Sequence, residues 1–244
     1  MKRIKLTIEY DGSNYCGWQK QPNQKTIQGE IEDAILRTIG QSVEVFGSGR
    51  TDAGVHAYNQ TAHFDLNVPV PVCKLKGILN SALPLDISIK EVAEVDGDFH
   101  SRFSIKKKTY LYKIYNSEEK NAFLANRMAR IIKYLDIGKM QEASKYLIGK
   151  HNFKGFCSAN ACATDFNREI FDINISRKEE YVFVEVCGSG FLYNMVRIIV
   201  GTLVDYALQK LTLEDILFAL EKGDRSKSGQ TMPACGLYLK ETYY

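Results

Sequence analysis

The most informative stretch of the chain is Gly47-Ser48-Gly49-Arg50-Thr51-Asp52-Ala53-Gly54-Val55-His56-Ala57. It separates an apolar run at 43–46 from a segment at 62–68 in which apolar and polar residues alternate, as in a half-buried strand. Glycine adopts positive φ and admits close approach of a ligand, so three glycines near Asp52 predict a turn that presents this carboxylate. Arg50 and His56 place hydrogen-bond donors beside the acid. The alternative is an ordinary polar hairpin loop, because Gly, Ser, Thr and Asp are the usual turn residues.

On both sides of this turn, the hydrophobic pattern predicts strands mixed with helices. We expect strands at 4–10, 62–68, 87–95, 106–116, 168–176, 181–187 and 237–243. Helices are expected at 27–35, between Pro71 and Pro84, at 138–147, at 191–208 and from Thr212 to Gly223. Mixing without strict alternation favours the α+β class with a largely antiparallel, mixed sheet. We expect two halves, 1–100 with the Asp52 turn and 101–244, that face one cleft and form one catalytic unit.

Composition and charge limit the classes of function. The 244 residues are 45% hydrophobic, as in an ordinary globular protein, and the net charge of +3 is too small to establish nucleic-acid binding by itself. The six cysteines lie far apart without a C-x-x-C pair, so we expect free thiols and no metal site. No signal peptide precedes the first strand, which predicts a cytoplasmic protein.

The apolar segment 191–208 carries a polar stripe. Asn194, Arg197, Gly201 and Asp205 are spaced by three, four and four residues, so they lie on one narrow face of a helix. Charges near a bilayer centre are costly, so this stripe predicts a buried helix and no membrane span. A partly buried guanidinium requires an acidic or phosphate partner, and we expect Arg197 to pair with Asp52. The alternative is a stripe that faces water.

The segment 105–113 mixes cations with aromatic rings. Such a surface suits phosphates and bases, and the alternative is the solvated face of a strand. Within it, Tyr110 has a ring that can stack on a base and a hydroxyl that can exchange a proton. The chain has 14 tyrosines, however, and core packing is the alternative for this one.

Several familiar sites are excluded by spacing. Gly47-Ser48-Gly49-Arg50-Thr51 lacks the Gly-Lys-Ser/Thr ending of a phosphate-binding loop, and Gly47, Gly49 and Gly54 miss the dinucleotide fingerprint. We therefore expect no nucleotide cofactor. A glycoside hydrolase needs two carboxylates, and near Asp52 the sequence offers no clear second acid, Asp11 being the one conceivable candidate.

Motifs along nearly the whole chain resemble the tRNA pseudouridine synthase A family. The first resemblance is the Asp52 motif followed by Gln60. The others are Tyr10-Asp11-Gly12 with Gly17-Trp18-Gln19, Phe99-His100-Ser101-Arg102-Phe103 with Lys108-Thr109-Tyr110, Gly190-Phe191-Leu192-Tyr193-Asn194-Met195-Val196-Arg197, and 231–239. The segment 158–167 is less typical of the family.

The resemblance implies the pseudouridine synthase fold and isomerisation of uridine to pseudouridine in the anticodon stem and loop of tRNA. It implies that Asp52 is catalytic, as a nucleophile or as a base on the sugar, that Tyr110 contacts the target base, and that Arg197 pairs with the acid. It further implies a homodimer that needs no cofactor or metal. Expected RNA contacts are Arg50, His56, His100, Arg102, Lys106, Lys107 and Lys108.

Two other functions remain open at this point. One is a catalytically silent RNA-binding or folding module that uses the same basic surface. The other is a hydrolase that cleaves the glycosidic bond without rejoining it, for which the missing second carboxylate is unfavourable.

Overall fold

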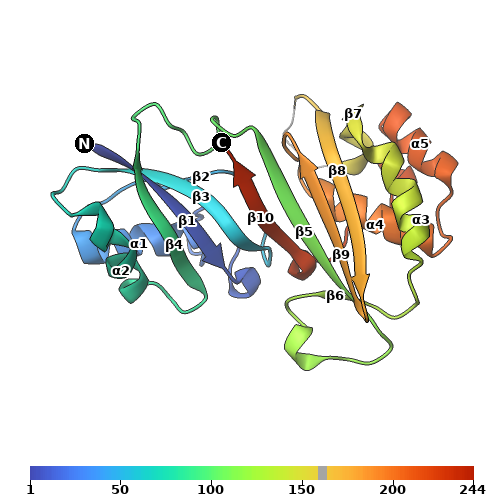
Figure 1. Cartoon of the computed structure of the whole chain (residues 1–244), viewed down its shortest axis with the longest axis horizontal. Coiled ribbons are helices and arrows are strands. Elements are labelled where there is room, and N and C mark those ends of the chain that lie inside the picture. Colours follow the sequence, from blue (N-terminus) through green and yellow to red (C-terminus); the bar gives the residue numbers. More distant parts are fainter. Residues whose placement is uncertain (159–163) are drawn as a thin grey trace. The chain divides into compact units, whose positions relative to one another are not determined.

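The computed structural model describes residues 1–158 and 164–244. The backbone divides into two units, and each unit combines a sheet with helices (Figure 1). The first unit comprises residues 1–106 together with 238–244, and the second comprises residues 107–237.

The last strand of the chain explains why these units differ from the expected halves, 1–100 and 101–244. Tyr238 pairs in parallel with His56, so the C-terminus belongs to the sheet of the first unit. The backbone N–H of Lys106 donates to the carbonyl of Tyr243 at 2.9 Å, which extends the first unit past residue 100. Pairing between residues so far apart in sequence leaves no local signal.

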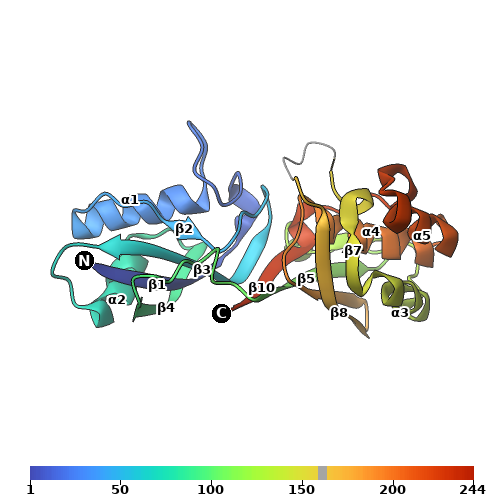
Figure 2. The ribbon, with the colours of Figure 1, turned by 90° about the horizontal axis from the view of Figure 1, so that it is seen from above.

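The first unit is a sheet with two α-helices. Its elements are β1 (Lys2–Tyr10), β2 (Phe46–Gly47), β3 (His56–Leu66), β4 (Ile87–Val95), β10 (Leu237–Tyr243), α1 (Ile27–Ile39), α2 (Val72–Ala82) and the 3₁₀ helix η1 (Gly12–Asn14). The strand order is β4-β1-β3-β10, and β2 also pairs with β3. Alternation along β1 buries Ile4, Leu6 and Ile8 completely. Helix α1 lies along one face of this sheet (Figure 2), and α2 packs against β4 and α1.

The second unit has the strand order β5-β9-β8-β7, with β6 beside β5. Its elements are β5 (Lys107–Asn116), β6 (Ala129–Ile131), β7 (Gly149–Asn152), β8 (Asn167–Lys178), β9 (Tyr181–Gly188), α3 (Ile137–Ser144), α4 (Met195–Ala207), α5 (Leu213–Lys222), η2 (Ala122–Leu124), η3 (Lys145–Leu147), η4 (Phe153–Phe156), η5 (Arg225–Lys227) and η6 (Ala234–Gly236). The three α-helices gather beside β7 and β8 (Figure 1). Helix α4 is buried nearly all round, as its apolar sequence predicts.

The predicted class, α+β with a largely antiparallel sheet, is confirmed. Most strand pairs are antiparallel, whereas β10 with β3 and β6 with β5 are parallel. Two elements differ from expectation: β3 begins already at His56, and the apolar run 43–46 contributes only Phe46 to β2. The short strands β6 and β7 were not predicted, because three or four residues carry too little alternation to be recognised.

Three findings concern cysteines, metals and membranes. Cys16, Cys73, Cys157, Cys187 and Cys235 carry free thiols, and Cys162 lies outside the described residues together with the rest of 159–163, which is half of the segment 158–167. Across 1–158 and 164–244, no cluster of three or more His, Cys, Asp or Glu side chains could hold a metal ion. Within the same ranges, no helix has both the length and the apolar character needed to cross a membrane.

Helix α5 begins with a capping box. Thr212 Oγ1 accepts from the N–H of Asp215, and Asp215 Oδ2 accepts from the N–H of Thr212. A hydrogen bond from Lys227, together with those from Thr212, lowers the pKa of Asp215 to about 2. A depressed carboxyl pKa stabilises the fold above the unfolded value of about 3.9, and this stabilisation is lost as the pH falls through the folded pKa.

We therefore expect the difference in melting temperature between wild type and Asp215→Asn to shrink as the pH falls from about 4 to about 2. The measurement is thermal unfolding followed by circular dichroism over that range. Glu214→Gln, on the same helical turn but outside the capping box, is the control and should show no such convergence. A difference that stays constant with pH would contradict the prediction.

Candidate active site

Asp52 opens a four-residue turn. The N–H of Val55 donates to the carbonyl of Asp52 at 3.1 Å, and Gly54, the third residue, has a φ of 77°. A type II turn requires positive φ at that place, which explains this glycine. Gly47 is needed for a different reason than predicted: an added Cβ would lie 2.5 Å from the ring of Trp18. Gly54 is therefore required for its positive φ, and Gly47 is required because a side chain there would clash with Trp18.

The loop after β1 holds this turn from one side. The N–H of Trp18 donates to the carbonyl of Thr51 at 3.0 Å. An added Cβ on Gly12 would lie 1.9 Å from the carbonyl oxygen of Val55, and one on Gly17, whose φ is 87°, would lie 2.4 Å from the carbonyl oxygen of Thr51. The two loops thus pack backbone against backbone. Sequence reasoning missed these contacts, although Gly12 and Gly17, which both lie in the quoted motif that starts at Tyr10, were the available signal.

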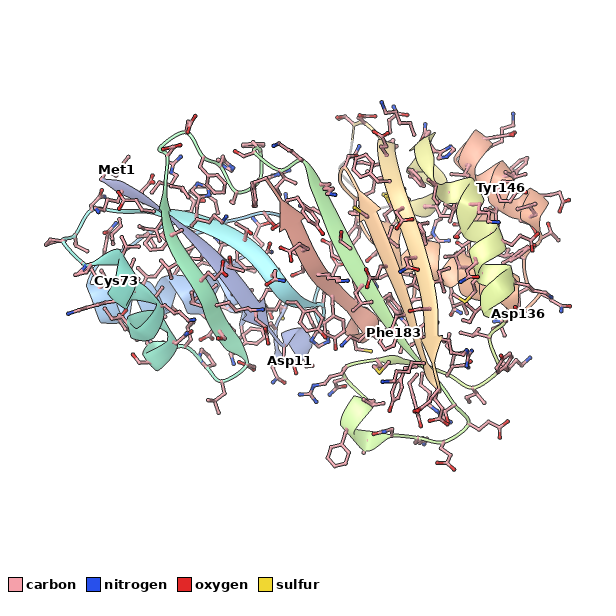
Figure 3. The ribbon with its side chains drawn as sticks, viewed as in Figure 1. Met1, Asp11, Cys73, Asp136, Tyr146 and Phe183 are labelled. Atoms are coloured by element: carbon pink, nitrogen blue, oxygen red, sulfur yellow. The ribbon has the colours of Figure 1, made fainter. Side chains whose placement is uncertain are left out.

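Side chains fix both ends of the turn. At the entrance, the hydroxyls of Tyr10 and Thr51 share a buried hydrogen bond of 2.8 Å. At the exit, His56 Nδ1 lies 3.1 Å from Asp11 Oδ1 and accepts from the N–H of Gly12 at 3.1 Å. Asp11 follows the end of β1 directly (Figure 3). Consecutive residues at the end of one strand therefore bracket the Asp52 turn.

The segment that leads from β2 into the turn is held by Gln60. Its Nε2 donates to the carbonyl of Gly49 at 2.8 Å, and its Oε1 accepts from the hydroxyl of Ser48. The N–H of Ser48 also donates to the carbonyl of Thr61 at 2.7 Å. Gln60 and Ser48 are completely buried, whereas Asp52 is partly exposed. A fixed backbone thus carries a partly exposed acidic residue.

The polar stripe of α4 is covered by the segment 228–232. Arg197 Nε donates to the carbonyl of Met232 at 2.6 Å, and its Nη1 donates to Asn194 Oδ1 at 2.7 Å. At the other end of the stripe, Asp205 Oδ2 accepts from the N–H of Gln230 at 3.1 Å. Gly201 is buried, and an added Cβ there would lie 1.9 Å from the carbonyl oxygen of Gln230. The alternative of a stripe facing water is therefore wrong.

The structure places Asp52 in the first unit, and Arg197 and Tyr110 in the second. The pairing of Arg197 with Asp52 stays a prediction. Tyr110 lies on β5, is 8% exposed, and meets the ring of Phe191 edge to face with centroids 5.2 Å apart. Tyr112, two residues further along β5, is completely buried, and this burial raises the pKa of its hydroxyl. The hydroxyl donates to the carbonyl of Pro233 at 2.6 Å.

The residues expected to contact RNA differ in accessibility. Arg50, Arg102, Lys106 and Lys107 are exposed, and Lys108 and His100 are partly exposed. His56 is 2% exposed and its ring stacks on Tyr238 with centroids 4.5 Å apart, an environment that favours a structural role in the turn.

A further histidine, His63, is neutral. Burial, together with the nearby His100, lowers its pKa to about 4, and its Nδ1 lies 2.9 Å from the hydroxyl oxygen of Ser101.

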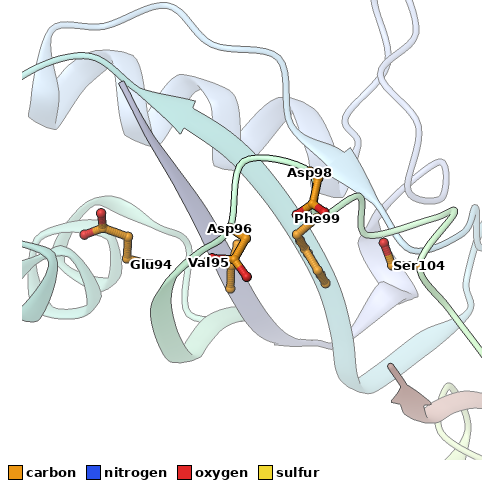
Figure 4. Close-up of a pocket in the computed structure, with 6 residues that line it drawn as sticks. All are labelled: Glu94, Val95, Asp96, Asp98, Phe99 and Ser104. Atoms are coloured by element: carbon orange, nitrogen blue, oxygen red, sulfur yellow. The ribbon is translucent and has the colours of Figure 1, made fainter.

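A pocket in the first unit lies at the end of β4 and does not include the Asp52 turn (Figure 4). Three of its residues are acidic, so it repels phosphate groups and does not suit a nucleic acid. It is lined by Glu94, Val95, Asp96, Asp98, Phe99 and Ser104.

Similarity to known proteins extends from end to end. A family model described as tRNA pseudouridine synthase matches residues 6–104 and 143–244, which include the Asp52 turn and α4. Proteins named tRNA pseudouridine synthase A from Caldicellulosiruptor bescii and Acetivibrio thermocellus are 47% and 46% identical over 244 residues, covering 100% of this chain and of each relative. A solved Cbf5-Nop10-Gar1 complex matches weakly, with a TM-score of 0.39 and 12% identity over 96% of this chain and 57% of that chain. On the family model and the full-length relatives, this chain belongs to the tRNA pseudouridine synthase family.

Proposed function

We propose that this protein isomerises uridine to pseudouridine in the anticodon stem and loop of tRNA, with Asp52 as the catalytic nucleophile. In this reaction the bond between ribose C1′ and uracil N1 breaks, the base turns, and C1′ bonds to uracil C5. The carboxylate attacks C1′ as N1 takes the bonding electrons. C5 later displaces the carboxylate from C1′ and loses its hydrogen as a proton, and N1 takes up one proton, so the product is a neutral isomer of uridine. The observation that carries the proposal is that Asp52 is partly exposed on a turn whose backbone is held from two sides.

Two residues of the second unit complete the proposed site. Arg197 pairs with Asp52 and keeps it ionised, because an opposite charge within hydrogen-bonding range lowers the pKa of a carboxyl group. Tyr110 contacts the target base through its ring, which Phe191 holds from the side. The detached uracil must be kept from water, so the target nucleotide leaves its helix and enters an enclosed site.

The accessible cations supply the contacts to RNA. An A-form helix is recognised mostly through its shape and phosphates, which suits long basic side chains on exposed loops and strand ends. The proposed contacts are Arg50, His100, Arg102, Lys106, Lys107 and Lys108, while buried His56 supports the Asp52 turn.

The test is a tritium-release assay on unmodified tRNA labelled at C5 of its uridines, without added metal or nucleotide. Each isomerisation replaces the C5 hydrogen by carbon, so release should equal the pseudouridine found in the digested RNA. Free uracil would instead identify a glycosidic hydrolase. Tight binding of tRNA without release would identify a silent RNA-binding module, and either result would reject the proposal.

Arg197→Lys should reduce turnover about 10- to 100-fold, because a lysine ammonium cannot replace a planar fork that makes two or more charged hydrogen bonds. The matched control is Arg177→Lys, since Arg177 also holds one backbone carbonyl, Leu135, and one amide oxygen, Asn116. Steady-state tritium release is the measurement. Equal losses in both variants would show that the Arg197 effect is a general loss of stability.

The family resemblance supports two further proposals, a homodimer and a cytoplasmic location. Sedimentation equilibrium tests the first, with an expected mass twice that of the 27.7 kDa chain. A species of one chain mass at micromolar concentration would reject it. Fractionation of cells that produce the protein tests the second, and recovery with the membranes would reject it.

A further inference from the structure

The residue before Asp52 is tied to the end of a central strand. Tyr10 is the last residue of β1, which pairs with β3 on one side and β4 on the other. Its hydroxyl shares the 2.8 Å hydrogen bond with Thr51 Oγ1, and the two residues are 3% and 7% exposed. The sheet therefore fixes the backbone of Tyr10, and the hydrogen bond holds the Thr51 side chain against the end of β1.

Thr51 is held a second time through its backbone. Its carbonyl accepts from the N–H of Trp18, and Gly17 packs against the same oxygen. With the hydroxyl and the carbonyl of one residue both held, the peptide that joins Thr51 to Asp52 has little freedom to turn. The next carbonyl, that of Asp52, closes the turn to Val55.

We propose that Tyr10 and Thr51 are positioning residues that aim the Asp52 carboxylate. This inference rests on the proposed function, in which Asp52 reacts at the ribose. Misplacing a reacting group by about 1 Å can cost about 100-fold in rate. Loss of the hydrogen bond between Tyr10 and Thr51, the residue before the acid, should therefore lower the turnover rate more than the affinity for tRNA. The pair joins the backbone that precedes the acid to the end of β1, in addition to the contacts of the adjacent loop.

Tyr10→Phe and Thr51→Val each remove this hydrogen bond while nearly keeping the side-chain shape. We expect kcat to fall roughly 10- to 100-fold in each variant, with KM and equilibrium binding of tRNA unchanged. The double variant should fall no further than the slower single variant, because both substitutions remove the same bond. Thr51→Ser keeps the hydroxyl and should retain most of the wild-type kcat.

Thr61→Val is the matched control. Thr61 shares a buried 2.8 Å hydroxyl bond with Thr242 in the same unit, so its loss should lower the melting temperature similarly and leave kcat unchanged. If Tyr10→Phe and Thr51→Val keep the wild-type kcat while Asp52→Ala is inactive, the positioning role is wrong and the proposed function stands. An equal fall of kcat in Thr61→Val would also overturn it. An active Asp52→Ala would instead reject the proposed function.

Discussion

Asp52→Ala should lower turnover by about 10⁴-fold or more while tRNA binding stays within about twofold of wild type. The substitution removes the group that reacts at C1′, but it leaves in place the basic side chains that are proposed to bind the phosphates. Tritium release measures the first effect, and filter binding of labelled tRNA measures the second. Asp52→Asn, which keeps the shape and removes the charge, should be equally inactive.

The control is Asp33→Ala, an exposed aspartate on α1. It should keep wild-type release and binding. The melting temperature of Asp33→Ala should stay close to that of wild type, because this aspartate is exposed. Normal turnover by Asp52→Ala would remove the chemical basis of the proposed mechanism.

Gly201→Ala should destabilise the protein, although alanine normally stabilises a helix interior. The added Cβ would lie 1.9 Å from the carbonyl oxygen of Gln230, a backbone atom on a segment tied to α4 through Arg197 and Asp205. Overpacking of this kind costs about 1–3 kcal/mol. For a chain of this length, that loss lowers the melting temperature by roughly 2–12 °C.

Gly77→Ala is the matched control for this substitution. Gly77 lies inside α2, and an added Cβ there meets nothing within 4 Å. It should raise stability by about 0.5–1 kcal/mol, since glycine is the poorer helix former. Thermal unfolding of the two variants therefore gives opposite signs. A stabilising Gly201→Ala would mean that the segment 228–232 moves away at little cost.

Local patterns were sufficient for most elements of the fold. Strand β4 was predicted with its observed limits from the hydrophobic pattern, and α5 was predicted between Thr212 and Gly223. These signals lie within a few residues of the element that they define. Strands β6 and β7 were missed because tertiary pairing, and not their own sequence, makes them strands.

The sequence by itself determined the longer strands and helices and their order, the class of fold, and the turn at Asp52, because periodicity and glycine placement act over short distances. Only the tertiary structure decided what holds that turn and what covers the stripe of α4. Tyr10 meets Thr51 across 41 positions, and Arg197 meets the carbonyl of Met232 across 35. Hydrogen bonds and backbone contacts of this kind depend on how strands and helices pack, and no local pattern records which distant atom a side chain will reach.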